Sequence, residues 1–275
     1  MGTRGFSRWV LAIPMALLAV ATLYPLLFTL NVSQKTRREY ILDRFGLTDT
    51  FGVSNFVDAW NTSGLGTYAL NSVIVTTGSV ILLLLFGSMA GFAFSQLHFH
   101  GSKAAFLLIL GALLVPFQVV MVPFFRVLGQ IGLLDTHAGL ILAYTAQFLP
   151  FTVFLMTSYY SRIPGEIIGA GRVDGASTFG IYLRLMLPLG RPALLSVGIL
   201  NALFCWNDVL ISLLTMQSAD HRTLMVGVTA LRGQYSDNIP LFASGVVMAA
   251  LPVLVVYLFF QKQITDGVTA GSTKG

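Results

Sequence analysis

The stretch that decides the fold is residues 69–95, ALNSVIVTTGSVILLLLFGSMAGFAFS, which contains no charged residue. A helix needs about 20 mostly apolar residues to cross the hydrocarbon core of a bilayer, so this stretch is long enough to span it. Five further runs have the same character, and together they predict spans over residues 9–30, 69–95, 104–125, 138–159, 192–216 and 241–261. No alternating pattern typical of strands occurs, and a helix satisfies its own backbone hydrogen bonds in lipid. The sequence therefore predicts an all-α polytopic membrane protein with six transmembrane helices.

The composition of the whole chain supports the same interpretation. Of 275 residues, 55% are hydrophobic and 10% are charged, whereas an ordinary soluble domain has about 25% charged residues. A soluble fold of this size cannot bury so much apolar surface, and a disordered chain needs far more charge. The net charge of +5 arises from basic residues in short loops between apolar runs. This distribution favours contact with a membrane surface over binding to nucleic acid.

The first run resembles a secretory signal because Arg4 and Arg8 precede it. Its apolar stretch continues to Leu30, which is too long for the core of a signal peptide, so we predict a retained helix. Six spans place both termini on one side of the membrane. If that side is the cytoplasm, it carries nine Lys and Arg residues against seven outside, a narrow majority in the expected direction.

The sequence lacks the common motifs of covalent chemistry. No lysine follows a glycine, so there is no phosphate-binding P-loop, and neither Gly-x-Ser-x-Gly nor His-Glu-x-x-His occurs. The single cysteine, Cys205, excludes an internal disulfide and a multi-cysteine metal site. We therefore expect no catalytic site, no metal and no cofactor.

One ionisable residue lies clearly within an apolar run. Asp208 follows Asn207 in the run over residues 192–216, and Asn201 precedes both. A charge is expensive inside a bilayer, so such a group has a function or a partner. Two interpretations stay open: these side chains line a water-filled path, or they form hydrogen bonds that orient the packing of helices.

The connection over residues 160–191 has the pattern of two short helices with a bend between them. Pro164 starts it, small residues occupy positions 169–177, and an amphipathic run continues to Leu187. Asp174 is expected to cap the second short helix. The small side chains of the bend leave room for another protein, and the apolar residues of the run recur at helical spacing: Phe179, Tyr182, Leu183 and Met186.

This connection, IPGEIIGAGRVDGASTFG over residues 163–180 and LPLGRP over residues 187–192, closely resembles the "EAA" loop of bacterial ABC-importer permease subunits. The C-terminal stretches FQK (260–262) and GVTAGSTKG (267–275) resemble the sugar-importing branch, and most of all its maltose-type second permease. Trp206-Asn207-Asp208 and Asn71-Ser72 also match that branch. One position departs from the family pattern, because the Glu that names the loop is Gly169 here.

The resemblance implies a permease subunit of an ATP-driven importer of sugars or related polyols, with residues 1–275 as one transmembrane domain. Such a chain is not an enzyme, since separate subunits hydrolyse ATP. The implied partners are a second and different permease, two ATPase subunits, an external solute-binding protein and the lipid membrane. The implied location is the bacterial cytoplasmic membrane, with both termini and the coupling loop on the cytoplasmic side.

The family motif also assigns roles to individual positions. Contact with the ATPase falls on Glu166, Ala170, Asp174, Gly175, Ala176, Ser177 and Phe179. The resemblance of the tail places a further contact with the ATPase on Gly267, Thr269 and Gly271. As polar groups within an apolar run, Asn207 and Asp208 are the candidates for the translocation path. The alternative is an ion-coupled secondary carrier of small solutes, which would need several intramembrane acids or broken helices. A membrane-embedded enzyme would need clustered His, Asp or Glu at one membrane face.

Overall fold

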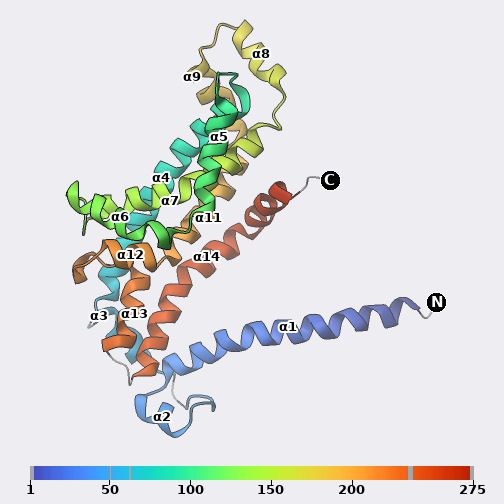
Figure 1. The fold of residues 1–275 in the computed structure, drawn as a ribbon. Coiled ribbons are helices and arrows are strands. Elements are labelled where there is room, and N and C mark those ends of the chain that lie inside the picture. Colours follow the sequence, from blue (N-terminus) through green and yellow to red (C-terminus); the bar gives the residue numbers. More distant parts are fainter. Residues whose placement is uncertain (1–2, 50, 62, 235–237, 273–275) are drawn as a thin grey trace. The chain divides into compact units, whose positions relative to one another are not determined.

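The computed structural model describes residues 3–49, 51–61, 63–234 and 238–272, and this part of the chain is helical without any strand (Figure 1). It divides into two compact units, residues 1–66 with 227–252 and residues 67–226 with 253–275. In chain order the helices are α1 (Thr3–Gln34), α2 (Arg37–Leu42), α3 (Ser54–Asn61), α4 (Leu65–Gln96), α5 (Ser102–Gly111), η1 (Ala112–Leu114), α6 (Phe117–Gln130), α7 (His137–Tyr160), α8 (Gly165–Val173), α9 (Thr178–Ile181), η2 (Tyr182–Met186), α10 (Leu187–Leu189), α11 (Arg191–Asn207), α12 (Leu210–Thr215), η3 (Ala219–His221), α13 (Leu224–Gln234) and α14 (Ile239–Ser272).

Four helices are long and apolar enough to cross a membrane by themselves: α1, α4, α7 and α14. They coincide with the predicted runs over residues 9–30, 69–95, 138–159 and 241–261. The helix α14 continues past the predicted run to Ser272.

The predicted run over residues 104–125 is not one helix. The helix α5 ends in the short turn η1, and α6 begins after Pro116 at an angle of 101°. Pro116 has an extended backbone, with φ −62° and ψ 134°. A proline ring disfavours the helical conformation at the preceding residue and cannot donate a helix hydrogen bond. Here the preceding residue, Val115, is extended with φ −91° and ψ 111°. The run therefore forms two helices bent at Pro116 rather than one straight helix, and the two together have the length and hydropathy of a single span.

The predicted run over residues 192–216 is also interrupted. The helix α11 ends at Asn207, Asp208 is extended with φ −70° and ψ 135°, and the short helix α12 follows. Hydropathy alone predicted one helix through this position. The side chain of Asp208 accepts a hydrogen bond from the Ser212 amide at 3.0 Å, so its carboxylate satisfies an orphan donor at the start of α12.

The helices α4 and α7 approach closely through glycines. Gly87 and Gly91 are four residues apart on α4 and face Thr152 and Met156 of α7. A Cβ atom at Gly91 would lie 2.6 Å from the Met156 Cβ and 2.9 Å from its backbone carbonyl carbon. This Gly-x-x-x-Gly spacing brings helix backbones together in membranes, where packing rather than hydrophobicity drives association.

We expect Gly91→Ala to lower the stability of this unit by about 1–3 kcal/mol, because α4 and α7 must separate to admit the methyl group. Gly111→Ala is the matched control, since a Cβ there meets nothing within 4 Å and alanine favours the helix. Thermal unfolding of the detergent-solubilised protein measures both. Equal melting temperatures for the two variants would contradict the packing described here.

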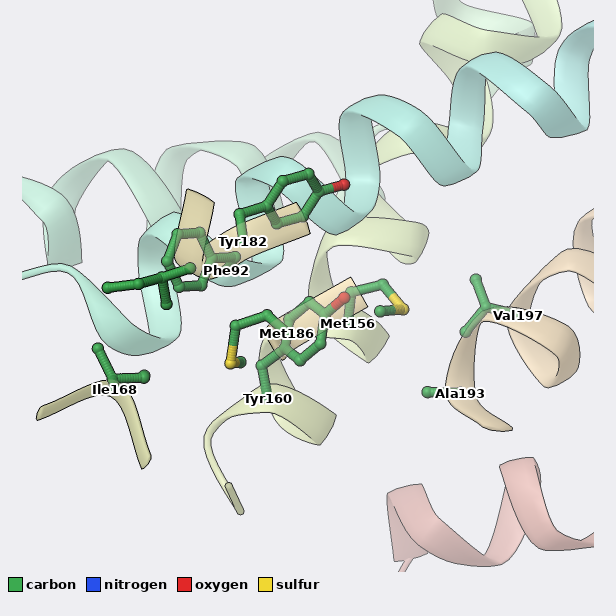
Figure 2. Packing of buried hydrophobic residues seen from close by; sticks show 9 residues of the cluster. Phe92, Met156, Tyr160, Ile168, Tyr182, Met186, Ala193 and Val197 are labelled. Carbon is green, nitrogen blue, oxygen red and sulfur yellow. The ribbon is translucent and has the colours of Figure 1, made fainter. Parts of the chain in front are cut away.

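The unit formed by residues 67–226 and 253–275 carries two buried clusters. The first joins α4, α7 and α11 to the α8–α10 segment, and Figure 2 shows Phe92, Tyr182, Met186, Met156 and Tyr160 at its centre. The second joins α4, α7, α11 and α12 around Tyr144 and Leu140. The α8–α9 region and the α6–α12 region lie at opposite ends of the helices α4, α7 and α11 (Figure 1).

The other unit packs the end of α1 against α3 and the start of α14. The Asn55 amide nitrogen donates to the carbonyl oxygens of Ser33 at 2.9 Å and Lys35 at 2.8 Å. The Ser244 hydroxyl donates to the Asn55 carbonyl oxygen at 3.0 Å. These hydrogen bonds fix the position of α3 in the unit.

Candidate functional site

The α8–α9 segment turns sharply on a glycine. The Gly175 amide donates to the Arg172 carbonyl at 3.0 Å, and the Ala176 amide donates to the Gly171 carbonyl at 2.9 Å. This pair of bonds is a Schellman motif, which needs a left-handed residue after the helix. Gly175 has a φ of +77°, a backbone conformation that favours glycine. The lack of a side chain would also leave room for a partner at this turn.

Ser177, not Asp174, caps the second short helix. The Ser177 hydroxyl oxygen accepts a hydrogen bond from the Gly180 amide at 3.1 Å. Asp174 stands at the C-terminal end of α8, with φ −73° and ψ 4°. The prediction that Asp174 caps the second helix is therefore wrong, because the chain becomes helical again only at Thr178. The carboxylate of Asp174 is left exposed.

One face of the segment is anchored to α4 and α7. Tyr182 is buried, and its hydroxyl lies 2.7 Å from the Ser88 hydroxyl. The Gln96 amide nitrogen donates to the carbonyl oxygens of Tyr160 at 2.6 Å and Ile163 at 3.3 Å. A displacement of the segment would therefore be passed to α4 through these hydrogen bonds.

The opposite face of the segment is exposed. Among the residues predicted to contact an ATPase, only Ala176 is half-buried, and the others are exposed: Glu166, Ala170, Asp174, Gly175, Ser177 and Phe179. The Phe179 side chain is 59% exposed, and that of Val173 is 88% exposed. Sequence analysis missed Val173 because it lies outside the family motif. Large apolar side chains presented this way indicate a surface that another molecule covers.

The predicted apolar stripe over residues 179–186 divides between the two faces. Tyr182 and Met186 are buried in the first cluster, whereas Phe179 and Leu183 are exposed. A π-helical stretch over η2 changes the helical phase within this stripe.

Two glycines in α8 have different surroundings. Gly171 is buried, and a Cβ there would lie 3.0 Å from the Leu185 Cδ1 atom, so its small size permits close packing. Gly169 occupies the position where the family pattern has Glu, and a Cβ there meets nothing within 4 Å. The helix forms despite both glycines, and nothing in the structure explains Gly169.

Asp208 and Asn207 have different environments. The Tyr144 hydroxyl donates to Asp208 Oδ2 at 3.0 Å, and the Ser212 amide donates to the same oxygen. Asn207 is exposed, and its side-chain amide donates to the Leu203 carbonyl of its own helix at 2.8 Å. Asp208 therefore connects the end of α11 to α12 and to α7. The hydrogen bond of Asn207 stays within α11.

Asn201 takes the helix-packing role. It is fully buried, and its amide nitrogen donates to the Thr152 hydroxyl of α7 at 2.9 Å. Of the two interpretations left open by the sequence, an interhelical hydrogen bond describes this residue.

A polar cluster beside the start of α7 escaped sequence analysis. Asp135 Oδ1 accepts hydrogen bonds from the amides of Gln217 at 3.0 Å and Ser218 at 3.1 Å, and lies 3.3 Å from His221 Nδ1. Desolvation raises the pKa of Asp135, but the hydrogen bonds from Ser218, Gln217 and His221 outweigh it and lower that pKa. The carboxylate therefore stays charged and, through these hydrogen bonds, holds the connection between α12 and α13 beside the start of α7.

The same cluster extends to α4. The Asn71 amide nitrogen donates to the carbonyls of Asp220 at 2.7 Å and Arg222 at 3.0 Å, and Asn71 Oδ1 lies 3.0 Å from His137 Nε2. The Ser72 hydroxyl accepts the Leu224 amide at 2.8 Å. The pair Asn71-Ser72, noted in the sequence for its resemblance alone, thus fixes the chain between α12 and α13.

The predicted tail residues Gly267, Thr269 and Gly271 lie in the last part of α14, where the side chains are outside the described residues. Among the side chains that are described, no group of three or more His, Cys, Asp or Glu is placed to hold a metal ion.

Comparison with known proteins defines the class. Residues 83–264 match the family "Binding-protein-dependent transport system inner membrane component". The chain is 34% identical to the arabinooligosaccharides transport system permease protein AraQ of Halalkalibacterium halodurans, over 99% of each chain. It is 31% identical to the melibiose/raffinose/stachyose import permease protein MelC of Bacillus subtilis, over 98% of each.

A solved bacterial ABC transporter involved in the import of the acidic polysaccharide alginate has the same fold. One of its chains matches with a TM-score of 0.83 at 22% identity, covering 95% of this chain and 98% of that one. The chain belongs to the binding-protein-dependent transport system inner membrane component family. It is a multi-pass inner-membrane permease subunit and not itself an enzyme.

Proposed function

We propose that the chain imports oligosaccharides or related polyols as one half of a permease pair. The observation that carries this proposal is the similarity along the whole chain to permeases named for arabinooligosaccharide and for melibiose, raffinose and stachyose transport. Sugars are neutral and rich in hydroxyl groups, so an amide and a carboxylate would be suitable groups to line the path. Asp208 and Asn207, at the break between α11 and α12, are the candidates to line or gate its outer end.

The proposed assembly contains this chain, a second and different permease, two ATPase subunits and an external solute-binding protein. The exposed face of α8 and α9 would dock on an ATPase, with Glu166, Asp174, Ser177 and Phe179 among its contacts. Gly267, Thr269 and Gly271 would add a second contact from the tail. Residues 1–275 would act as one transmembrane domain of six spans, with α5 and α6 counted as one bent span and α11 with α12 as another.

The anchoring of α8 and α9 suggests how ATP would drive transport. Closure of the ATPase pair would move the docked segment, and the Gln96 and Tyr182 hydrogen bonds would pass that motion to α4. The inward-open and outward-open states of the permease pair would then exchange populations. A ligand shifts such an equilibrium only through its different affinity for the two states.

The proposed orientation places both termini and α8–α9 in the cytoplasm. Ser161 follows the end of α7, and the Gln217 amide bonds Asp135 just before its start. At about 1.5 Å per residue a helix as long as α7 separates these positions by more than the hydrocarbon thickness. In intact cells, a cysteine at exposed Gln217 should react with an impermeant thiol reagent and one at exposed Ser161 should not. The reverse pattern would contradict the orientation.

The substrate class is tested through the external partner. We expect the solute-binding protein that stimulates the ATPase activity of the purified complex to retain an oligosaccharide or polyol, identified by mass spectrometry after denaturation. Retention of an amino acid, a peptide or a metal ion would contradict the sugar assignment and leave the family assignment unaffected.

A further inference from the structure

The loop after α2 is held in one conformation by the end of α1. The Asn31 amide nitrogen donates to the Gly46 carbonyl at 2.9 Å, and Asn31 Oδ1 accepts the Thr48 amide at 2.9 Å. Lys35 is fully buried, and its Nζ donates to the Asp43 carbonyl at 2.7 Å. The side chains of Asn31, in α1, and of Lys35, directly after α1, therefore hold the loop in a fixed shape.

The acidic groups of this segment bind its own backbone. Glu39 Oε1 accepts the Asp49 amide at 3.1 Å, and Asp43 Oδ1 accepts the Gly46 amide at 2.8 Å. The Gly46 hydrogen bond lowers the pKa of Asp43. The basic side chains face outward instead: Arg38 and Arg44 are exposed, and the Arg44 guanidinium lies 5.9 Å from the centre of the Tyr40 ring.

This fixed loop presents large apolar side chains. Leu42 is 76% exposed, Phe45 is 78% exposed and Leu47 is 85% exposed. Exposure of that much apolar surface to water is unfavourable at about 25 cal/mol per Å². Hydrogen bonds that fix a loop in such a shape indicate that an apolar medium or partner covers its tip.

The position of Phe45 beside α1 identifies that medium. Its ring lies 5.9 Å from the ring of Phe28, which lies 6.0 Å from that of Tyr24. Tyr24 and Phe28 belong to the apolar span of α1, where residues 12–27 are all exposed. The aromatic row is therefore continuous with a surface that lipid covers. Aromatic residues concentrate at such membrane interfaces.

We propose that the segment of residues 36–49 is a lipid-binding collar on α1. Leu42, Phe45 and Leu47 enter the interfacial layer of the leaflet next to the C-terminal end of α1. Arg38 and Arg44 bind the phosphate groups of anionic phospholipids in that leaflet. Apolar insertion beside basic residues is the pattern of interfacial anchors, and arginine suits phosphate.

Fluorescence quenching tests the insertion. An environment-sensitive fluorophore on Leu47→Cys, in a Cys205→Ala background, is compared with one on Gln217→Cys in the intact transporter in nanodiscs. Brominated phospholipids should quench the label at residue 47 several-fold more than the label at residue 217, and aqueous iodide should do the reverse. Quenching at residue 47 by iodide alone overturns the proposal. If the solute-binding protein then protects that label, the surface belongs to that protein.

Lipid retention tests the arginines. The transporter is purified from membranes of equal phosphatidylglycerol and phosphatidylcholine content. The ratio of bound phosphatidylglycerol to bound phosphatidylcholine should rise roughly fivefold for each arginine at the surface. Arg38→Gln with Arg44→Gln should remove the preference, and Arg38→Lys with Arg44→Lys should keep most of it. Unchanged retention in the glutamine variant would overturn the assignment of headgroup binding to these arginines.

Discussion

Phe179→Ala is expected to release the ATPase subunits and abolish uptake while leaving the permease folded in the membrane. The Phe179 ring is 59% exposed, beside the Ser177 cap and outside the buried cluster that Tyr182 anchors. Loss of a central aromatic contact costs about 2 kcal/mol or more, which is roughly 30-fold in affinity. Copurification of the ATPase and uptake of labelled oligosaccharide measure the effect.

Leu195→Ala is the matched control for Phe179→Ala. Leu195 is 52% exposed but lies on α11, outside the α8–α9 segment. Its truncation removes a similar amount of exposed apolar surface and should leave ATPase binding unchanged. Equal effects of the two variants would mean that Phe179 acts through general stability rather than through docking.

Asp208→Leu is expected to impair uptake more than it impairs assembly. It leaves the Tyr144 hydroxyl and the Ser212 amide without the oxygen that accepts them, at about 1–3 kcal/mol for each unpaired group. The helices α11 and α12 then lose the bond that fixes their angle. The amount of assembled complex and the initial rate of uptake are measured together.

Two further variants separate the roles of this site. Asp208→Asn keeps an acceptor for Tyr144 and Ser212 and should assemble normally. Asn207→Ala removes only a bond within α11, so a loss of uptake there would indicate a role in the path. If Asp208→Leu transports normally and the complex becomes more stable, the path-lining role of Asp208 fails.

Hydropathy predicted where the chain is apolar but not where a helix turns. The run over residues 69–95 became one helix because nothing in it interrupts the backbone pattern. The runs over residues 104–125 and 192–216 are also apolar, yet Pro116 and Asp208 divide them. A hydropathy window averages over such residues, whereas the extended backbone at Val115 and Pro116 and the capping carboxylate of Asp208 act at single positions.

The α8–α9 segment was predicted better in position than in detail. Two short helices form within residues 160–191, and most of the motif residues lie on the exposed face. The identity of the cap was wrong, since Asp174 and Ser177 are both good capping residues and only the Gly175 turn decides between them. The stripe splits because Tyr182 and Met186 pack in the buried cluster while Phe179 and Leu183 are exposed, a difference that the helical spacing of apolar residues does not contain.

The polar cluster around Asp135 shows a different limit of sequence analysis. Asn71 contacts the backbone of Asp220 and Arg222, residues far away along the chain. Its partners are mostly backbone carbonyls, which carry no residue-type signal. His137 and His221 lie at the edges of apolar runs, and only the fold brings their rings within 5.4 Å of each other.

Site-specific cross-linking at Val173 tests the central claim most directly. Val173 is 88% exposed at the end of α8 and makes no contribution to the buried cluster there. A photoreactive amino acid at this position, in the intact transporter, should cross-link to an ATPase subunit, and the same group at Leu195 should not. An assembled, transport-competent complex in which residue 173 never cross-links to the ATPase would contradict the assignment of α8–α9 as the coupling surface.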